Sequence, residues 1–421
     1  MIRMLARRRR VAMLSGLEAR FALGGLVDAT GTGCYLAGAA VFFSRKVGLA
    51  PSLIGVGVTV SGVLGFATTI PWGRAADRWG ARRVLVLLHC LRALAFALYA
   101  LVASLPAFLA VSALLGLADK ATPPIQQALI GEAVGEQRQR TFAIVRSTRN
   151  IGFALGALLA AAAVSSGTTL AYDGIVLLNA ASFAFIAVLM GTLRVERAST
   201  PLAQAARVTY GRWQIRDSRY TRLTVLNGTL TMHMSLLSVG LPLWLLWHTR
   251  APASVIPVLL AINAVLAVAL QVPIASRVRS PQAAASALTV AGVALAVCCL
   301  TMPLAATLGA TGAVVAAVSG VLALTVAELA QSAGGWELSF RLAPVDRRAQ
   351  YLGVFSLGTT AQAMVGPVLL TGVVFALGTA GWTLLAATTL VTGIFVPAAM
   401  RRMERARLCP EIVRSEDVLP L

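Results

Sequence analysis

Charge is scarce in this chain. Aspartate, glutamate, lysine and arginine together make up 12% of its 421 residues, whereas a typical soluble domain carries about 25%. Acidic residues are fewer than basic ones, with 16 in the whole chain against 36. So little charge does not suffice to cover the surface of a soluble domain, and we therefore expect no sizeable soluble domain.

Cysteine and histidine are also scarce, and neither residue is grouped. The five cysteines lie mostly in apolar runs, where they behave as small hydrophobic residues, and none has zinc-ligand spacing to a histidine. The three histidines, His89, His233 and His248, are far apart, and no D-D-x-x-D carboxylate cluster occurs. We therefore expect no metal, no cofactor and no disulfide. A membrane enzyme such as a lipid transferase is disfavoured, and so is an ion channel, because no carbonyl-filter segment is present.

Apolar sequence is what the chain has in abundance. Hydrophobic residues make up 58% of it, and its mean hydropathy is +0.80. A membrane-spanning helix takes about 20 residues, and the apolar runs predict twelve of them. All should be helical, because lipid offers the backbone no hydrogen-bond partner. The predicted spans are 21–43, 53–71, 84–104, 107–130, 143–165, 173–193, 222–246, 254–275, 283–303, 312–338, 351–375 and 379–400.

Lysine and arginine number 36 and give a net charge of +20, which by itself would suggest a nucleic-acid partner. Their distribution argues against that interpretation. With twelve spans, only Arg45, Lys46 and Arg250 fall in outside loops, as the positive-inside rule requires of a membrane protein. We therefore expect both termini in the cytoplasm, a cytoplasmic anchor at residues 7–10, and no nucleic acid. A twin-arginine export signal is the alternative for residues 7–10, but no small-residue cleavage site follows them.

The loop between the second and third predicted spans, residues 73–83, reads GRAADRWGARR. Its four arginines place it in water on the cytoplasmic side. The loop resembles the signature of the major facilitator superfamily, G-x-x-x-D-R-x-G-R-[KR], which joins helices two and three of those proteins. The residues that carry the resemblance are Gly73, Asp77, Arg78 and Gly80, in register, and Arg82 and Arg83, with one residue of slack.

The resemblance implies a secondary transporter with the major facilitator fold. That fold has two pseudo-symmetric six-helix bundles, with the substrate site between them near the midplane. The resemblance also implies that residues 73–83 act as a cytoplasmic gate. Asp77 would accept hydrogen bonds from the N-terminus of a neighbouring helix, where the dipole favours an anion. The side chains of Arg78, Arg82 and Arg83 would bind carbonyls or acids of the other half.

The domain organisation follows from the twelve spans. We predict an N-terminal six-helix bundle with a basic cytoplasmic tail over 1–193, and a basic cytoplasmic linker over 194–221. A C-terminal six-helix bundle over 222–400 and a cytoplasmic tail over 401–421 complete the chain. A weak internal repeat supports two halves, because an acid of the fourth and of the tenth span precedes a loop arginine at equal spacing.

Three acids lie inside predicted spans: Asp28 in the first, Asp119 in the fourth and Glu328 in the tenth. A charge at the bilayer centre costs about 2.5–3.5 kcal/mol on insertion scales, so such a residue faces a cavity or a charged partner. A buried carboxyl can take up and release a proton as its surroundings change. We therefore predict that Glu328, Asp28 or Asp119 carries a coupling proton. The alternative is a structural role in an ion pair, namely Asp119–Lys120, Asp28–Arg92 or Asp28–Arg149.

Polar residues at helical spacing accompany these acids in spans one, four and ten, and recur in span seven. The resemblance implies that these four spans line the central cavity. A helix surrounded by lipid would not keep such a polar stripe. We therefore predict that the following residues line the cavity or contact the substrate: Thr32, Tyr35, Gln126, Gln127, Asn227, Thr231, Ser235, Gln331 and Trp336.

Glycines recur in the second and fifth spans, and we expect them to let helices approach closely. A dinucleotide-binding fingerprint is excluded, because no strand precedes these glycines. The glycines concerned are Gly55, Gly57, Gly62, Gly65, Gly152 and Gly156.

The predicted function is proton-coupled efflux of small lipophilic compounds by alternating access. Residues 179–183 and 341–358 resemble bacterial efflux-type members, whereas Ser112 and Ala157 depart from the arginine and proline of many drug exporters. The alternative is a symporter that takes up a polar metabolite. The expected partners are a small-molecule substrate, protons and the lipid bilayer. We expect a monomer in a bacterial cell membrane.

Overall fold

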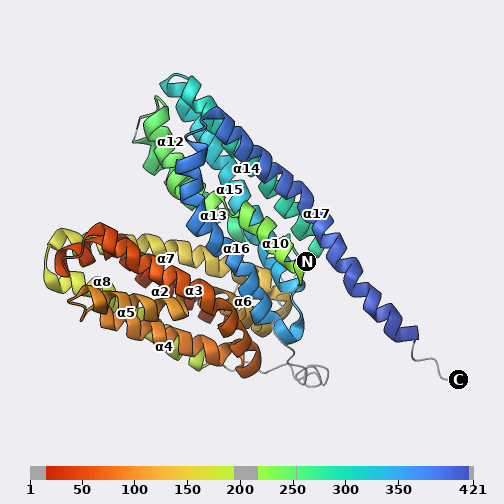
Figure 1. Ribbon diagram of the computed structural model, residues 1–421, viewed down its shortest axis with the longest axis horizontal. Helices are drawn as coiled ribbons and strands as arrows, with labels where there is room; N and C mark the ends of the chain where they lie inside the picture. Colours follow the sequence, from red (N-terminus) through yellow and green to blue (C-terminus); the bar gives the residue numbers. More distant parts are fainter. Residues whose placement is uncertain (1–15, 194–216, 253, 417–421) are drawn as a thin grey trace, which may run out of the picture. The chain divides into compact units, whose positions relative to one another are not determined.

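The computed structural model describes residues 16–193, 217–252 and 254–416, and in these ranges it contains helices and no strand (Figure 1). The basic run at 7–10, most of the predicted linker and the last residues of the predicted tail lie outside the described residues. Nine helical stretches in the described part are long and apolar enough to cross a membrane by length and composition. The predicted all-α membrane fold is confirmed.

Each of the twelve predicted spans corresponds to a helical segment. The stretch Leu105–Ser166 contains two of the predicted spans. The predicted spans 21–43 and 84–104 are helical as well, although they are not among the nine stretches that meet the length and hydropathy criteria.

The chain divides into two compact units. Unit 1 comprises Met1–Ala205 and Val345–Gly353, and unit 2 comprises Ala206–Pro344 and Val354–Leu421. The described helices of unit 1 are α2 (Gly16–Val41), η1 (Phe42–Lys46), α3 (Pro51–Trp79), α4 (Ala81–Tyr99), α5 (Leu105–Asp119), α6 (Thr122–Val134), η2 (Gly135–Gln137), α7 (Arg138–Ser166), α8 (Thr169–Gly191) and η5 (Val345–Arg347). Those of unit 2 are α10 (Ser218–Leu230), α11 (His233–Ser235), η4 (Leu236–Gly240), α12 (Leu241–His248), α13 (Val255–Ala275), α14 (Pro281–Thr307), α15 (Ala310–Arg341), η6 (Leu370–Val374) and α17 (Thr379–Glu416).

Helix α16 (Arg348–Leu369) belongs to both units. Its first turns, up to Gly353, group with unit 1, and the helix continues in unit 2 from Val354. The grouping matters because the loop 73–83 lies in unit 1 and contacts the beginning of this helix.

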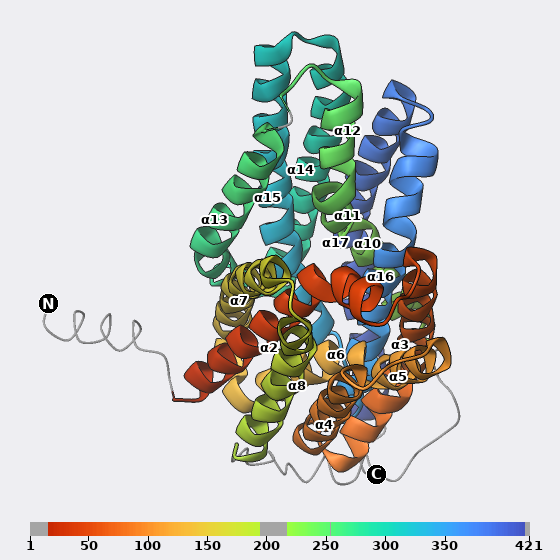
Figure 2. The same ribbon diagram turned by 90° about the vertical axis from the view of Figure 1, so that its left-hand side faces the viewer.

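Within unit 1, α2 packs along α7, α4 along α8, and α3 along α5 (Figures 1 and 2). Gly152 and Gly156 bring α7 against the backbone of α2, as predicted. A Cβ atom at Gly152 would lie 2.5 Å from the carbonyl oxygen of Leu26, and one at Gly156 would collide with that of Thr30. These two glycines are therefore required by the close approach of the two helices.

The glycines of the second span behave in two ways. A side chain at Gly57 would meet the ring of Phe108, and one at Gly65 would meet the aliphatic part of Lys120. Gly55 and Gly62 have open space where a Cβ would be. The prediction of close helix packing is thus wrong for Gly55 and Gly62 and correct for the other two.

The fourth span is broken, whereas the sequence pattern predicts a continuous helix over 107–130. Helix α5 ends at Asp119 and α6 begins at Thr122. Pro123 and Pro124 follow that start. Proline has no backbone N–H and clashes with the preceding turn, so it is tolerated in the first turn of a helix and breaks a helix interior. The two prolines therefore set a helix end in the middle of the span and place Asp119 at it.

Within unit 2, α14 packs against both α15 and α17, and α10 packs against α17. Two spans of this unit contain π-helical turns, η4 between α11 and α12 and η6 after α16. Such turns occur mostly as bulges inside longer helices. Helix α17 continues to Glu416, past residue 400, where the predicted twelfth span ends.

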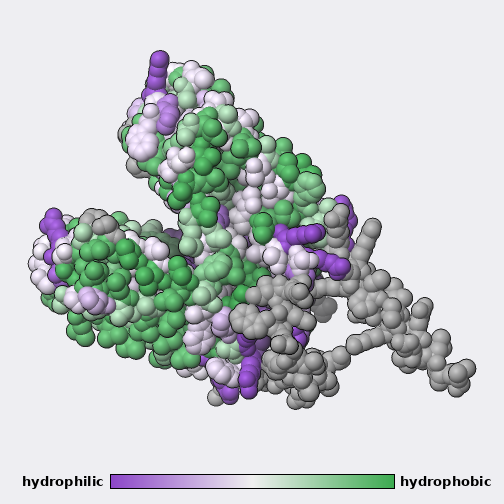
Figure 3. Space-filling view, in the orientation of Figure 1, coloured by the Kyte–Doolittle hydropathy of each residue, from purple (hydrophilic) through white to green (hydrophobic). Residues whose placement is uncertain are grey.

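Large apolar side chains cover the outside of the helices. In the face that Figure 3 shows, each unit has a mostly apolar flank, and hydrophilic residues gather toward its ends. Leu158 is 68% exposed and Val265 is 67% exposed. An exposed apolar surface of this extent would be unfavourable in water, and it is satisfied by a lipid bilayer.

Candidate functional site

The loop 73–83 is shaped by two of its glycines. Gly80 ends α3 with a φ of 96°, a backbone conformation that glycine adopts without steric cost. Its N–H donates to the carbonyl of Ala76 at 2.8 Å. A Cβ at Gly73 would lie 2.8 Å from the Cα of Gln350, so only glycine lets α3 approach the start of α16 this closely.

Asp77 caps the N-terminus of α16. Its Oδ1 accepts a hydrogen bond from the N–H of Ala349 at 2.8 Å, and its Oδ2 accepts one from the N–H of Gln350 at 2.9 Å. The first backbone N–H groups of a helix have no partner inside the helix, and the helix dipole favours an anion there. The hydrogen bonds predicted for Asp77 are present, and they reach a segment more than 270 residues away in the sequence.

The arginines of the loop differ in their contacts. Arg82 donates to the carbonyls of Gly191, at 3.3 Å, and Leu193 at the end of α8. It therefore binds carbonyls as predicted, but these carbonyls belong to its own unit and not to the other half. Arg78 and Arg83 are exposed and form no hydrogen bond or ion pair with the residues that the structure describes.

Five charged side chains of unit 1 form one connected series, which we call the charge chain: Lys120–Asp119–Arg92–Asp28–Arg149. Arg92 on α4 lies at its centre and bonds Asp28 on α2 at 3.4 Å and Asp119 at 3.3 Å. Lys120 pairs with Asp119 at 3.0 Å, and Arg149 on α7 pairs with Asp28. All three ion pairs that the sequence suggests as the alternative to proton coupling are thus formed.

Aromatic rings adjoin the charge chain. The guanidinium carbon of Arg92 lies 3.8 Å from the centroid of the Phe183 ring, a cation–π contact. Phe183 in turn packs on Phe96 with ring centroids 5.5 Å apart, and Phe96 packs edge-on against Tyr35 at 4.7 Å. Tyr35 therefore lies beside the charges, on the same helix as Asp28. Thr32 lies between Asp28 and Tyr35 in the sequence and is half-buried. Its hydroxyl oxygen is buried and forms no hydrogen bond with the residues that the structure describes.

Gln126 and Gln127 lie half-buried on α6, in the half of the fourth span that follows the break. Unit 1 thus contains one group of predicted site residues that are linked by direct contacts, centred on Asp28 and Asp119. The second group of predicted residues lies in unit 2, where the contacts are hydrogen bonds of amide side chains.

Glu328 is the buried acid of unit 2. It lies on α15, a helix of 32 residues, and is 7% exposed. Its Oε2 accepts a hydrogen bond from Nδ2 of Asn263 on α13 at 3.2 Å. The same amide nitrogen donates to Thr325 at 3.0 Å. A neutral amide therefore orients this carboxyl.

Two further amide contacts connect the polar residues of unit 2. Nε2 of Gln331 donates to Oδ1 of Asn227 at 2.9 Å, which ties α15 to α10. Nε2 of Gln362 donates to the hydroxyl of Ser235 at 2.8 Å. The hydroxyl of Thr231 donates to the carbonyl of Gly228, three residues earlier in the chain, at 2.6 Å. Trp336 is half-buried on α15.

The sequence-based prediction omitted two residues of this network, Asn263 and Gln362. Asn263 stands in an apolar helix, Val255–Ala275, whose other strongly polar side chain is Gln271. An amide side chain in a span that is otherwise almost entirely apolar is the signal that would have identified it. Gln362 carries a weaker signal, because threonines precede it in the same helix.

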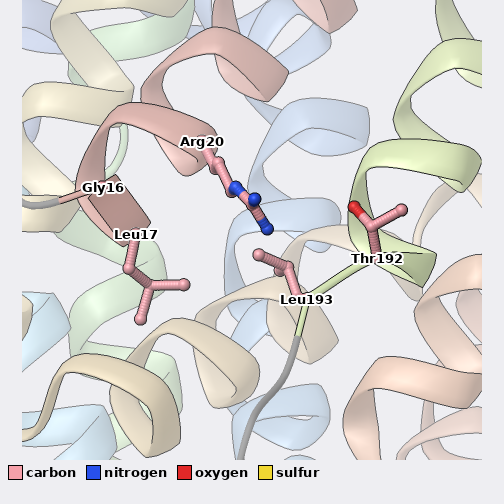
Figure 4. Close-up of a pocket in the computed structure, with 5 residues that line it drawn as sticks. All are labelled: Gly16, Leu17, Arg20, Thr192 and Leu193. Carbon is pink, nitrogen blue, oxygen red and sulfur yellow. The ribbon is translucent and has the colours of Figure 1, made fainter.

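A cavity of about 540 Å³ lies elsewhere in unit 1. It is lined by Gly16, Leu17, Arg20, Thr192 and Leu193, where α2 begins and α8 has ended, and the Arg20 side chain extends toward Leu193 (Figure 4). At 1.5 Å per residue, Asp28 is about 18 Å further along α2 than Gly16. This cavity is therefore separate from the charge chain.

Comparison with known proteins finds a family match over most of the chain. A family model described as Major Facilitator Superfamily matches residues 21–367. No curated protein matches the sequence.

Solved structures of transporters share the fold. The human organic anion transporter MFSD10 (TETRAN) is 20% identical, with a TM-score of 0.60, covering 90% of this chain and 98% of that one. A bacterial homologue of the iron transporter ferroportin, in the outward-facing state with soaked iron, is 17% identical, with a TM-score of 0.68, covering 93% and 100%. The proton:xylose symporter XylE is 12% identical, with a TM-score of 0.69, covering 90% and 94%. At these identities the likeness is one of fold.

Proposed function

The chain belongs to the major facilitator superfamily, a family of secondary transporters, and from this premise we propose that it exports small lipophilic compounds in exchange for protons. Residues 1–193 and 222–400 are the two bundles that rock in this proposal. The chain acts as a monomer in a bacterial cell membrane, with both termini in the cytoplasm. The following features support the proposal.

The observation that carries proton coupling is the placement of Glu328. It is buried in the middle part of a helix long enough to span the bilayer. An ionised carboxylate at such a depth is costly unless water or a partner compensates it. Protonation removes that cost when the cavity closes, and ionisation returns when water enters. Asn263 holds the carboxyl in place through both states.

Asp28 and Asp119 are assigned a different role. Each accepts ion pairs from two cations. Removing one charge from a buried ion pair leaves its partner uncompensated, which is strongly unfavourable. A proton that neutralised Asp28 would leave Arg149 without an anion in this series, and one that neutralised Asp119 would do the same to Lys120. We therefore place the coupling proton on Glu328 and give the two aspartates the task of holding Arg92.

The contact between Asp77 and α16 serves as the cytoplasmic latch. Helix α16 passes from unit 1 to unit 2 after Gly353. A carboxylate of α3 that binds its first turn therefore holds a helix whose remainder moves with unit 2. Breaking two charge-assisted hydrogen bonds must precede that movement. Gly73 allows the approach and Arg82 anchors the loop to the end of α8.

Transport into and out of liposomes tests this function. The purified full-length chain is reconstituted with a pH-sensitive dye inside, and a panel of cationic, neutral and anionic lipophilic compounds is loaded. An acidic outside should accelerate efflux of a compound while the interior acidifies. Accumulation of the compound under the same gradient would instead establish symport, the alternative of proton-coupled uptake. Flux that ignores the gradient would overturn proton coupling.

The role of Glu328 is tested by Glu328→Gln, with Glu337→Gln as its matched control. Glu337 is buried on the same helix and bonds Arg341 at 2.8 Å. We expect Glu328→Gln to exchange substrate without responding to a pH gradient, and Glu337→Gln to remain coupled. A Glu328→Gln transporter that still responds fully to the gradient would remove Glu328 from the mechanism.

A further inference from the structure

The charge chain of unit 1 alternates in sign along its length. In the order Lys120–Asp119–Arg92–Asp28–Arg149, each neighbouring pair is of opposite charge and in contact. Three cations therefore meet two anions. The central cation, Arg92, has an anion on each side, whereas the cation at each end has one anion that it shares with Arg92.

The exposed fraction of these side chains is lowest in the middle of the charge chain and highest at its ends. The side chains of Arg92 and Asp28 are 7% and 9% exposed. The two terminal cations are far more open, with 41% of the Lys120 side chain and 32% of the Arg149 side chain exposed. The enclosed part of the charge chain is thus the part that is balanced, and the surplus positive charge is carried by its accessible ends.

Lys120 lies far from both ends of the fourth span. Lys120 stands between α5, which has 15 residues, and α6, which has 13, so it lies about 20 Å from either end of the span. A lysine side chain cannot reach the membrane surface from there. A cation at that depth is stable only against water or an anion, so its exposed part faces a hydrated space and not acyl chains.

The local structure accommodates the Lys120 side chain. A Cβ at position 65 would collide with its Cγ, so Gly65 on α3 provides the space in which its aliphatic stem lies. At the other end of the charge chain, the Arg149 guanidinium carbon lies 5.5 Å from the centroid of the half-buried Phe153 ring. Tyr35, also half-buried, lies next to Phe96. Phe153 therefore lies beside an accessible cation, and Tyr35 lies on the ring cluster that adjoins Arg92.

We propose that the exposed cationic ends of the charge chain, Lys120 and Arg149, provide the positive charge that binds an amphipathic organic anion, whose apolar body packs on Tyr35 and Phe153. The proposal rests on the proposed export function and names its substrate class. The anionic group supplies the negative charge that the five side chains lack. Asp28 and Asp119 position the cations and repel a cationic substrate.

A pair of dyes with one aromatic frame and opposite charge tests this proposal. Fluorescein is an anionic xanthene at neutral pH, and rhodamine 123 is a cationic one. Binding of each to the purified full-length chain, in nanodiscs of neutral phosphatidylcholine, is measured by fluorescence polarisation without any pH gradient. We expect the chain to bind fluorescein more tightly than rhodamine 123, by on the order of tenfold, the scale of one charge-assisted contact.

Variants at the two ends sharpen the test. Lys120→Gln and Arg149→Gln should each weaken fluorescein binding by about tenfold. Lys120→Arg, which keeps the charge, should retain most of it. Lys46→Gln is the matched control, because Lys46 is also an ion-paired cation of unit 1 but lies at the end of the first span. It should leave the preference unchanged.

Three results would overturn the proposal: equal or tighter binding of rhodamine 123, binding of neither dye, or a preference for fluorescein that survives in the double variant of Lys120→Gln and Arg149→Gln. The wild-type comparison decides the question even if that variant does not fold. Anion binding without proton-driven flux would refute the export function alone. Proton-driven flux without anion preference would refute this substrate class alone.

Discussion

In unit 1 the buried Asp28 and the half-buried Asp119 are joined through one guanidinium, that of Arg92, whereas in unit 2 Glu328 accepts a hydrogen bond from the amide of Asn263. Asp28 and Asp119 are thus bonded to cations, and Glu328 accepts a hydrogen bond from a neutral amide. An acid in an ion pair must stay ionised for its cationic partner to remain compensated. An acid held by an amide can change its charge without leaving that donor uncompensated.

We connect this difference to two proposed roles, the positioning of cations in unit 1 and the coupling of protons in unit 2. The charge chain keeps its charges fixed and so presents a permanent cationic surface at Lys120 and Arg149. In the function we propose, the amide contacts of unit 2 are kept while the charge of Glu328 changes. The following four changes test the contrast, in order of decreasing expected effect.

Arg92→Leu should have the largest effect. It leaves the buried Asp28 and the half-buried Asp119 with one cation each and removes the cation–π contact with Phe183. Breaking a buried ion pair from one side costs about 3–5 kcal/mol, so the free energy of unfolding should fall by about that amount. Thermal unfolding in nanodiscs measures it. Arg45→Leu, at an exposed arginine of the same unit, is the control and should change little. A loss as small as that of the control would show that the charge chain does not hold unit 1 together.

Asn263→Leu should have the next largest effect. It removes the donor of the hydrogen bond to Glu328 and leaves that oxygen buried. Loss of a hydrogen bond to a charged group costs about 1.5–3 kcal/mol, and the same thermal measurement reports it. Coupling of flux to the pH gradient should weaken as well, because Glu328 loses its fixed position. An equal loss for Asn263→Leu and Arg92→Leu would erase the contrast between the two units.

Asp77→Asn should slow transport while leaving substrate affinity nearly unchanged. A charge at a helix N-terminus is worth about 0.3–2 kcal/mol, so turnover should fall several-fold at constant Kd. Asp217→Asn is a matched control, because Asp217 caps the start of α10 within its own unit, with hydrogen bonds of 3.2 Å to the N–H groups of Arg219 and Tyr220. Unchanged turnover in Asp77→Asn would exclude the latch.

Lys46→Gln should have the smallest effect. Lys46 pairs with Asp173 and donates to the carbonyl of Ala100 at 2.9 Å, near the end of the first span. Ion pairs near a surface contribute about 0.2–1 kcal/mol, so the free energy of unfolding should fall by no more than that. Loss of the same size as for Arg92→Leu would show that depth does not govern the strength of these pairs.

Several features of the fold could be predicted from the sequence. The helical spans follow from uninterrupted apolar runs, because lipid allows few other backbone structures. The loop 73–83 was recognisable because its glycines and charges recur at fixed spacing, and the hydrogen bonds of Asp77 to a helix N-terminus followed from the dipole. The break at Asp119 was also readable in the sequence, since Pro123 and Pro124 follow it, but the continuous apolar run concealed it.

The candidate site was only partly predictable. Span assignment identified Asp28, Asp119 and Glu328 as costly residues, and it suggested each ion pair of the two aspartates separately. It did not reveal that Arg92 bonds both aspartates at once, since this depends on how α2, α4 and α5 meet. Asn263 was overlooked because one amide barely alters the hydropathy of α13. Whether these acids couple protons or hold cations therefore remained open at the level of sequence.

The sequence by itself determined that the chain crosses a membrane as helices, and it located the loop with Asp77 and the few acids that lipid would not tolerate. These properties depend on local hydropathy and spacing, which each segment carries alone. Only the tertiary structure decided that Asp77 caps α16 and that Lys120, Asp119, Arg92, Asp28 and Arg149 form one alternating chain. Ion pairs act over a few ångströms, and packing of helices far apart in the sequence sets which charges come within that distance.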